Sequence, residues 1–179
     1  MMLAALDYEA GPIAIRFPRG TAVAGPSSPQ RSAVPIGKGE VLRRGADAAL
    51  VAVGSMVSTA LAAAEILSRS GISVSVIDAK FIKPLDADLL MSLAGDGSAI
   101  VFALEENARS GGFGDAILGF YSDRSPGTRV VRIGLPDRFV PHGKREDLLE
   151  EIGISAGAVA AEVAGFARSR AQTGQGGSR

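Results

Sequence analysis

Short apolar runs alternate with segments of helical periodicity through most of this 179-residue chain. Four of the runs have the length and the Val, Ile and Ala content of buried strands. Between them, apolar residues recur every three or four positions, as on the buried face of a helix. This alternation predicts a doubly wound α/β domain, with a mostly parallel sheet and helices on both faces. The four predicted strands are residues 48–53, 72–77, 98–104 and 129–134.

Signals at the ends of the intervening segments support this arrangement. Val57 to Leu67 have helical spacing, and Gly71 suits the position that follows a helix. Asp86 is a candidate N-cap for the next helix. Residues 39–43 are predicted to form a short strand that a tight turn places as an antiparallel hairpin at the edge of the sheet. Further helices are predicted at residues 113–122, around Leu148 to Ile152, and after Ser155.

Composition restricts the classes of function. Lys plus Arg and Asp plus Glu number 19 each, and no basic stripe is present, so neither nucleic acid nor a membrane is an expected partner. The absence of Cys and the presence of a single His exclude a structural zinc site, a disulfide framework and Cys or Ser–His nucleophilic catalysis. The sequence has neither a run of the ~18 apolar residues that a membrane span needs nor a signal-peptide pattern, so a cytoplasmic location is expected.

The beginning of the chain is expected to belong to a different unit. Met2 to Leu6 have the pattern of a short helix, and Ile13 to Phe17 alternate as a strand. Because a helix and one strand cannot form a domain, we expect this segment to be the end of a domain whose beginning precedes the sequence. Residues 21–35 are rich in Gly, Pro and Ser and are expected to be a linker. Residues 169–179 are predicted to be a disordered, low-complexity tail.

A glycine-rich segment after the third buried run is the first candidate site. Glu105 and Glu106 lie where that strand should end, and three glycines within residues 111–114 lead into the next helix. Ligand sites are built at the carboxyl ends of parallel strands, but the glycine spacing fits neither a dinucleotide fingerprint nor a P-loop. Two interpretations remain: a ligand loop, or a turn in which Glu106 or Asn107 caps the helix. Adjacent strand residues face opposite sides, so only one of the two glutamates can face a given site.

Charged residues elsewhere offer further candidates. Arg19, between a proline and a glycine, suits bidentate binding of a phosphate or carboxylate, with an inter-domain salt bridge as the alternative. Arg16 is expected to form a structural ion pair. Lys83 either faces an anion or is a solvated residue before a helix. His142 is either a general base or a loop or interface residue. No cluster of residues has metal-ligand spacing.

Five short motifs follow one another along the chain. They are Arg16–Gly20, Ile36–Glu40, Phe81–Asp86, Glu105–Asn107 with Gly111–Gly114, and Gly134–Asp137 with His142–Gly143. As a set they resemble the C-terminal part of the 1-deoxy-D-xylulose-5-phosphate synthase family, across roughly residues 1–168. Transketolases and the β subunits of 2-oxo acid dehydrogenases share the fold. The Arg-Phe-Pro-Arg-Gly and Gly-Leu-Pro-Asp stretches favour the synthases.

The resemblance implies a fold and a chemistry. Residues 36–168 would form a transketolase C-terminal domain, a three-layer α/β/α unit with a five-stranded, mostly parallel sheet and one antiparallel edge strand. Residues 1–20 would be the last helix and strand of the pyrimidine-binding domain. Members of the family condense pyruvate with glyceraldehyde 3-phosphate and release CO₂, using thiamine diphosphate and Mg²⁺; the product feeds isoprenoid, thiamine and pyridoxal synthesis. Arg19 matches the arginine that binds the phosphate of the aldehyde.

The chain departs from the family where the cofactor is bound. The resemblance implies that this part of the family lacks the Gly-Asp-Gly…Asn element that holds the metal and diphosphate, the glutamate that activates the aminopyrimidine, and the histidines that handle protons. The tripeptide Gly95-Asp96-Gly97 of this chain lies within the matched C-terminal part and, by the same resemblance, is not that element. In such enzymes the cofactor carries the chemistry. We therefore expect the isolated chain to bind no cofactor, to contribute no catalytic, metal-binding or cofactor-binding residue, and to be inactive.

Three interpretations of the chain remain open. It is a fragment of a synthase, the C-terminal chain of a split transketolase-like enzyme, or a non-catalytic dimerisation or interaction domain. Active sites in the family lie at dimer interfaces, so a homodimer, or assembly with the missing N-terminal domains, is expected. The coding sequence upstream of Met1 would separate the first interpretation from the other two.

Overall fold

Five strands form one mixed sheet in the computed structural model, which describes residues 1–17, 33–95 and 100–174. The strands are β1 (Glu40–Arg43), β2 (Ala48–Ala52), β3 (Val74–Asp78), β4 (Ile100–Ala108) and β5 (Arg129–Leu135). Their order across the sheet is β1-β3-β2-β4-β5, and only the β1–β3 pairing is antiparallel. The helices are α1 (Met2–Leu6), α2 (Met56–Arg69), α3 (Ala87–Ala94), α4 (Phe113–Arg124), α5 (Arg145–Glu151) and α6 (Ala156–Gly174).

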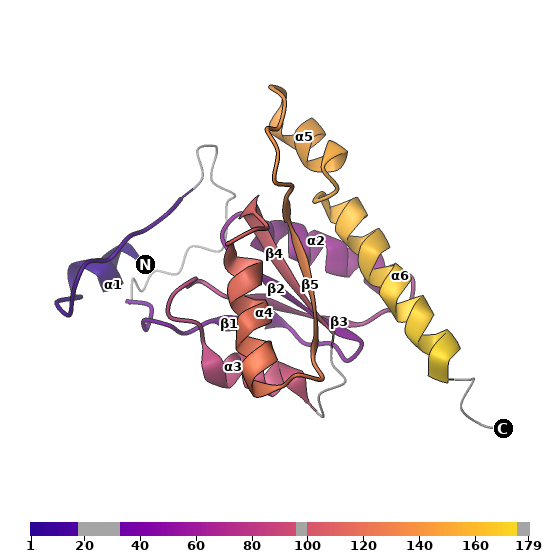
Figure 1. Ribbon diagram of the computed structural model, residues 1–179, viewed down its shortest axis with the longest axis horizontal. Coiled ribbons are helices and arrows are strands. Elements are labelled where there is room, and N and C mark those ends of the chain that lie inside the picture. Colours follow the sequence, from indigo (N-terminus) through magenta and orange to yellow (C-terminus); the bar gives the residue numbers. More distant parts are fainter. Residues whose placement is uncertain (18–32, 96–99, 175–179) are drawn as a thin grey trace.

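Alternating side chains of the strands divide the core into two layers (Figure 1). Leu50 and Phe102 belong to the apolar cluster that packs against α2 and α6. Their neighbours Val51 and Val101 belong to the cluster beneath α3 and α4. Burial of both faces explains why these strands read as continuous apolar runs. The predicted three-layer α/β/α fold with one antiparallel edge strand is confirmed.

The predicted hairpin between β1 and β2 is wrong, because β1 pairs with β3 instead. The turn between β1 and β2 crosses the start of β3, where the Gly45 N–H donates to Ser75 Oγ at 3.0 Å. A Cβ atom at Gly45 would lie only 2.4 Å from the backbone of Val74. This close passage carries the chain past β3 and places β1 on the outer side of that strand.

The N-terminal segment differs from the prediction in one respect. The helix near Met2 is present as α1, but Ile13 to Phe17 pair with no strand in the part of the chain that the structure describes. A strand needs a hydrogen-bonding neighbour, which the alternation of residues cannot reveal. Arg19 and residues 21–32 of the predicted linker lie outside the described residues. At the other end, α6 continues to Gly174, beyond the predicted start of the tail at residue 169.

The junction between β4 and α4 corrects the predicted helix cap. β4 continues to Ala108 rather than ending at residue 104, and the side chain of Glu105 is turned inward, with only 2% of the residue exposed. Its two carboxylate oxygens accept hydrogen bonds from the backbone N–H groups of Phe113 and Gly114, each at 2.8 Å. Glu105 therefore caps α4, in place of Glu106 or Asn107, and its negative charge lies at the positive end of the helix.

This cap leaves no room for a side chain at Gly112, where a Cβ atom would lie 2.3 Å from Glu105 Oε2. Gly112→Ala should therefore lower the free energy of unfolding by more than about 2 kcal/mol, since displacing the carboxylate leaves buried N–H groups unpaired. Gly119→Ala is the matched control in the same helix, because its Cβ meets nothing within 4 Å; we expect a gain of up to about 1 kcal/mol. Urea unfolding of both variants tests this, and equal effects would contradict the account of the cap.

Candidate functional site

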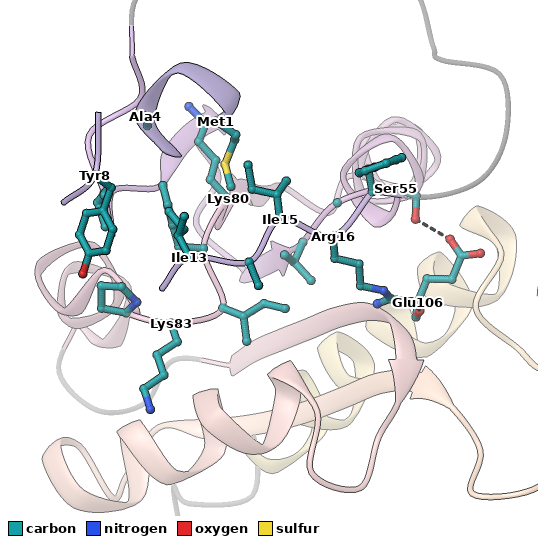
Figure 2. Close-up of a pocket in the computed structure, with 18 of the residues that line it drawn as sticks. Met1, Ala4, Tyr8, Ile13, Ile15, Arg16, Ser55, Lys80, Lys83 and Glu106 are labelled. Atoms are coloured by element: carbon teal, nitrogen blue, oxygen red, sulfur yellow. Dashed lines mark hydrogen bonds between the residues drawn. The ribbon is translucent and has the colours of Figure 1, made fainter. Parts of the chain in front are cut away.

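A cavity of about 710 Å³ lies between the carboxyl edge of the sheet and the N-terminal segment (Figure 2). The carboxyl ends of the four parallel strands meet at this edge. The cavity wall includes residues 53–55 after β2, residues 80–84 after β3, Glu106 of β4 and Leu135 of β5. The N-terminal segment supplies the opposite wall, including Ile13 to Phe17.

The cavity coincides with the point where the strand order reverses. β3 lies on one side of β2 and β4 on the other. α2, which follows β2, covers one face of the sheet, whereas α4, which follows β4, covers the other. In open α/β sheets, the connections diverge at such a point and leave a crevice in which ligands bind. Ser55 at the start of α2 and Glu106 near the end of β4 both line the cavity at this point.

Glu106 is the centre of the polar contacts in the cavity wall. Its carboxylate accepts two hydrogen bonds from Arg145, from Nε at 2.8 Å and from Nη2 at 2.5 Å. The hydroxyl of Ser55 donates to the same carboxylate (Figure 2). The backbone carbonyl of Glu106 accepts a hydrogen bond from Arg16 Nη2 at 3.1 Å. One residue thus joins β4, α2, α5 and the N-terminal segment.

The electrostatic environment keeps Glu106 ionised. The hydrogen bonds from Arg145 lower the pKa of the Glu106 carboxyl below its ordinary value; partial burial opposes this shift, and the bond from Ser55 adds to it. A carboxylate held in this way is a poor proton donor at neutral pH. The arrangement therefore favours an anchoring role for Glu106 over general acid catalysis.

Other side chains give the cavity a positive and an apolar character. Lys80 and Lys83 line the wall on the side of the sheet, and Arg16 lines it together with the apolar side chains of Ile13 and Ile15 on the N-terminal segment. Lys80 Nζ is also 2.5 Å from Glu40 Oε2. Lys80 has a φ of 56°, a conformation that non-glycine residues rarely adopt outside special sites. Such a mixture suits a small anion that carries a carbon skeleton.

The residues singled out from the sequence are only partly brought together. Glu106 faces the cavity while Glu105 faces α4, as strand alternation requires. The hydrogen bond of Arg16 goes to the backbone carbonyl of Glu106 rather than to a carboxylate. Lys83 is exposed on the cavity wall, and His142 is exposed and does not line it. The expected phosphate ligand, Arg19, lies outside the described residues.

Three contributors to the cavity were missed by sequence reasoning: Ser55, Lys80 and Arg145. Ser55 and Lys80 each follow a predicted strand, so their position alone was an available signal. Arg145 carries no such signal, because it contacts a residue 39 positions earlier.

Two kinds of feature are absent from the described residues. No three His, Asp or Glu side chains in residues 1–17, 33–95 and 100–174 gather closely enough to hold a metal ion. None of the helices in the same ranges combines the length and hydrophobicity needed to cross a membrane.

Comparison with known proteins identifies the family. The family model described as the transketolase C-terminal domain matches residues 37–159. The chain belongs to this family. It is 44% identical over 174 residues to the 1-deoxy-D-xylulose-5-phosphate synthase of Heliobacterium modesticaldum, which covers 96% of this chain and 27% of that relative. It is also 44% identical over 161 residues to the synthase of Geobacillus thermodenitrificans, covering 89% of this chain and 25% of the relative. The chain thus spans about a quarter of the length of these curated relatives.

Solved structures support the assignment of this chain to the transketolase C-terminal domain family. A structure described as a split gene transketolase, inactive beta4 tetramer, superimposes with a TM-score of 0.69 at 35% identity, covering 80% of this chain and 46% of that one. A transketolase variant from Pichia stipitis has a TM-score of 0.52 at 24% identity, covering 73% of this chain and 18% of that one. The second comparison bears on the fold alone.

The lowered pKa of Glu106 predicts a pH-dependent contribution to stability. The contribution is complete above the ordinary value of 4.5 and is lost as pH falls through the lower folded-state value. Glu106→Gln should therefore lower the free energy of unfolding at neutral pH by about 1–3 kcal/mol. The difference from the unmodified chain should shrink below pH of about 4.

Urea unfolding at neutral pH and at pH of about 3 measures this difference. Glu65→Gln is the control, since the Arg43–Glu65 pair is mostly solvent-exposed on its carboxylate side and should contribute less than about 1 kcal/mol. A destabilisation by Glu106→Gln that is the same at both pH values would contradict the electrostatic explanation.

Proposed function

We propose that this chain supplies the transketolase C-terminal domain of a 1-deoxy-D-xylulose-5-phosphate synthase. The reaction is the condensation of pyruvate with glyceraldehyde 3-phosphate and the release of CO₂. Support comes from 44% identity to such a synthase over 96% of the chain. Since the chain spans only about a quarter of that relative, the remaining domains must come from further polypeptide, in the same protein or in a partner.

Thiamine diphosphate and Mg²⁺ are the cofactors that the family resemblance implies for the complete enzyme. The resemblance implies that the elements that hold the metal, the diphosphate and the aminopyrimidine lie outside the part of the family that this chain matches. We therefore propose that the cofactor is held by the remaining domains. The role of this chain is to pack against those domains and to help bind the substrate.

The cavity at the carboxyl edge is the observation that carries this proposal. Phe17 is the last described residue of the cavity wall before residue 18. Arg19, two positions later in the sequence, is the residue that the family resemblance assigns to the phosphate of the aldehyde. Lys80 lines the same cavity and is only partly exposed. We propose that these two cations face the phosphate of glyceraldehyde 3-phosphate in the assembled enzyme, because paired cations suit a doubly charged phosphate.

A split enzyme is the second candidate. The 35% identity and the TM-score of 0.69 to a split gene transketolase favour it. In that case the chain would be a separately made subunit that assembles with an N-terminal chain. A homodimer of the complete assembly, with this domain near the dimer interface, is the arrangement that the family resemblance implies. A chain that self-associates and binds no such partner would instead be a non-catalytic dimerisation domain.

Reconstitution tests the proposed function. The chain is mixed with the part of the Heliobacterium modesticaldum synthase that it does not match, together with thiamine diphosphate and Mg²⁺. Formation of 1-deoxy-D-xylulose 5-phosphate is measured from pyruvate and glyceraldehyde 3-phosphate. We expect no product from either polypeptide alone and clear turnover from the mixture.

Two controls make this experiment decisive. Replacing the substrates with the ketose and aldose phosphates of transketolase distinguishes the split-transketolase alternative. Turnover by the purified chain alone would refute the proposal, and so would a mixture that forms a stable complex but no product with either pair of substrates.

Arg19→Gln should weaken recognition of the phosphate in the reconstituted enzyme. A lost charge-assisted contact corresponds to about a 10- to 100-fold rise in KM for glyceraldehyde 3-phosphate. The KM for pyruvate should change little, since pyruvate carries no phosphate. Arg129→Gln is the matched control, because Arg129 stacks on Phe166 away from the cavity. Equal KM values for the aldehyde in the two variants would remove Arg19 from the phosphate site.

A further inference from the structure

Lys80 has an unusual backbone conformation at the carboxyl edge of the sheet. Its φ of 56° is the one positive value among the non-glycine residues of 1–17, 33–95 and 100–174. A side chain in this conformation is crowded by its own backbone, so such residues persist only where surrounding contacts hold them, and they concentrate at functional sites. Lys80 also lines the cavity. Two contacts hold it there, one on its backbone and one on its side chain.

The side chain of Asp78 holds the backbone of Lys80. Asp78 is the last residue of β3, and its Oδ1 accepts a hydrogen bond from the Lys80 N–H at 3.0 Å. Asp side chains readily make this bond to the N–H two residues later, and the bond closes a local turn. The intervening residue, Ala79, donates its N–H to the Ala52 carbonyl at 2.9 Å. The turn at Lys80 thus starts from a backbone that β2 and Asp78 both hold.

Charge reinforces the contact between Asp78 and Lys80. Burial raises the pKa of the Asp78 carboxyl, whereas the Lys80 N–H and the Lys80 ammonium both lower it. Each of these two interactions is therefore stronger with the ionised carboxylate than with the neutral acid. Asp78 is not among the residues that line the cavity, so its carboxylate acts on the cavity through Lys80.

Glu40 holds the other end of Lys80. β1 pairs with β3 so that Glu40 lies opposite Asp78, and Lys80 Nζ lies 2.5 Å from Glu40 Oε2. The Lys80 side chain is only 21% exposed. An ammonium group has three N–H donors, and this ion pair uses one of them. The other two remain for an anion in the cavity, and the turn and the ion pair together fix where they lie.

We infer that Asp78 is a positioning residue: by accepting the Lys80 N–H, it sets the turn that holds the Lys80 ammonium at the cavity wall. This inference rests on the proposed function for the identity of the anion, which is the phosphate of the aldehyde. The positioning itself is independent of the reaction. Asp78 contacts no substrate in this account.

Kinetics of the reconstituted enzyme test the positioning of the cation. Asp78→Ala should raise the KM for glyceraldehyde 3-phosphate by about two- to tenfold, the effect of one hydrogen bond, and leave the KM for unphosphorylated glyceraldehyde unchanged. Asp78→Asn should keep both KM values within about twofold of the unmodified chain, because its amide oxygen accepts the same N–H. Lys80→Gln removes the cation, so adding Asp78→Ala to it should raise the KM no further.

Asp47→Ala is the matched control for Asp78→Ala. Asp47 Oδ2 accepts the Ser73 N–H at 2.7 Å, just before the other end of β3, and Asp47 does not line this cavity. Neither KM should therefore change in this variant. An unchanged KM in Asp78→Ala, equal losses with both aldehydes, or an effect that persists without the Lys80 ammonium would each overturn the positioning role. If the reconstituted unmodified enzyme is inactive, the proposed function fails, and the isolated chain decides the positioning.

Acetylation of the isolated chain measures the positioning without any substrate. Lys80 reacts with acetic anhydride only when its ammonium leaves Glu40 and loses a proton. Mass spectrometry should show acetylation of Lys80 about two- to tenfold faster in Asp78→Ala than in Asp78→Asn or Asp47→Ala. Lys83, which is exposed, should react equally in all three variants. Equal rates for Lys80 in the three variants, or faster reaction of both lysines in Asp78→Ala, would overturn the positioning whatever the enzyme assay shows.

Discussion

The buried carboxylate of Glu105 is the interaction on which the arrangement of this domain most depends. It holds the first N–H groups of α4 at 2.8 Å and thereby fixes how α4 returns over the sheet. Gly112 allows this approach because a Cβ there would collide with the carboxylate. An ionised group with two N–H donors is a stable way to bury a charge. The position at which α4 begins above the sheet follows from this cap.

In β4, the alternation of side chains between the two faces of the sheet gives two adjacent glutamates different roles. Glu105 continues the row of β4 side chains that faces α4, and Glu106 continues the row that faces α2. One carboxylate therefore serves the core, while its neighbour reaches the cavity and joins four segments. The cavity lies where the strand order reverses, so topology rather than any single motif places the polar groups there.

The sequence allowed most of the architecture to be predicted because the buried strands are short, apolar and regularly spaced. The pairing of the strands was harder to predict from the sequence. β1 pairs with β3 because Gly45 passes close to Val74, and this contact joins residues that are distant in the sequence. The cap was assigned one or two residues too late, to Glu106 or Asn107, because strand periodicity alone does not show where β4 ends. The strand expected at Ile13 to Phe17 failed because its formation depends on a neighbour.

The candidate site could be predicted only in outline. Glu106 was found because it ends a buried strand, but Ser55 and Arg145 lie 51 and 39 residues away from it. Folding alone brings these three together. The expected role of Arg19 came from the family resemblance alone. Nothing in the residues around Arg19 distinguishes a phosphate ligand from a partner in a salt bridge.

Hydrogen exchange on mixing the chain with the remaining domains of a related synthase tests the central claim most directly. If the carboxyl edge and the N-terminal segment face those domains, amides in residues 1–17 and 80–84 should become protected on mixing. The face formed by α3 and α4 should serve as an internal reference with a smaller change. Protection confined to that face, or none at all, would contradict the assignment of this chain as the missing C-terminal domain.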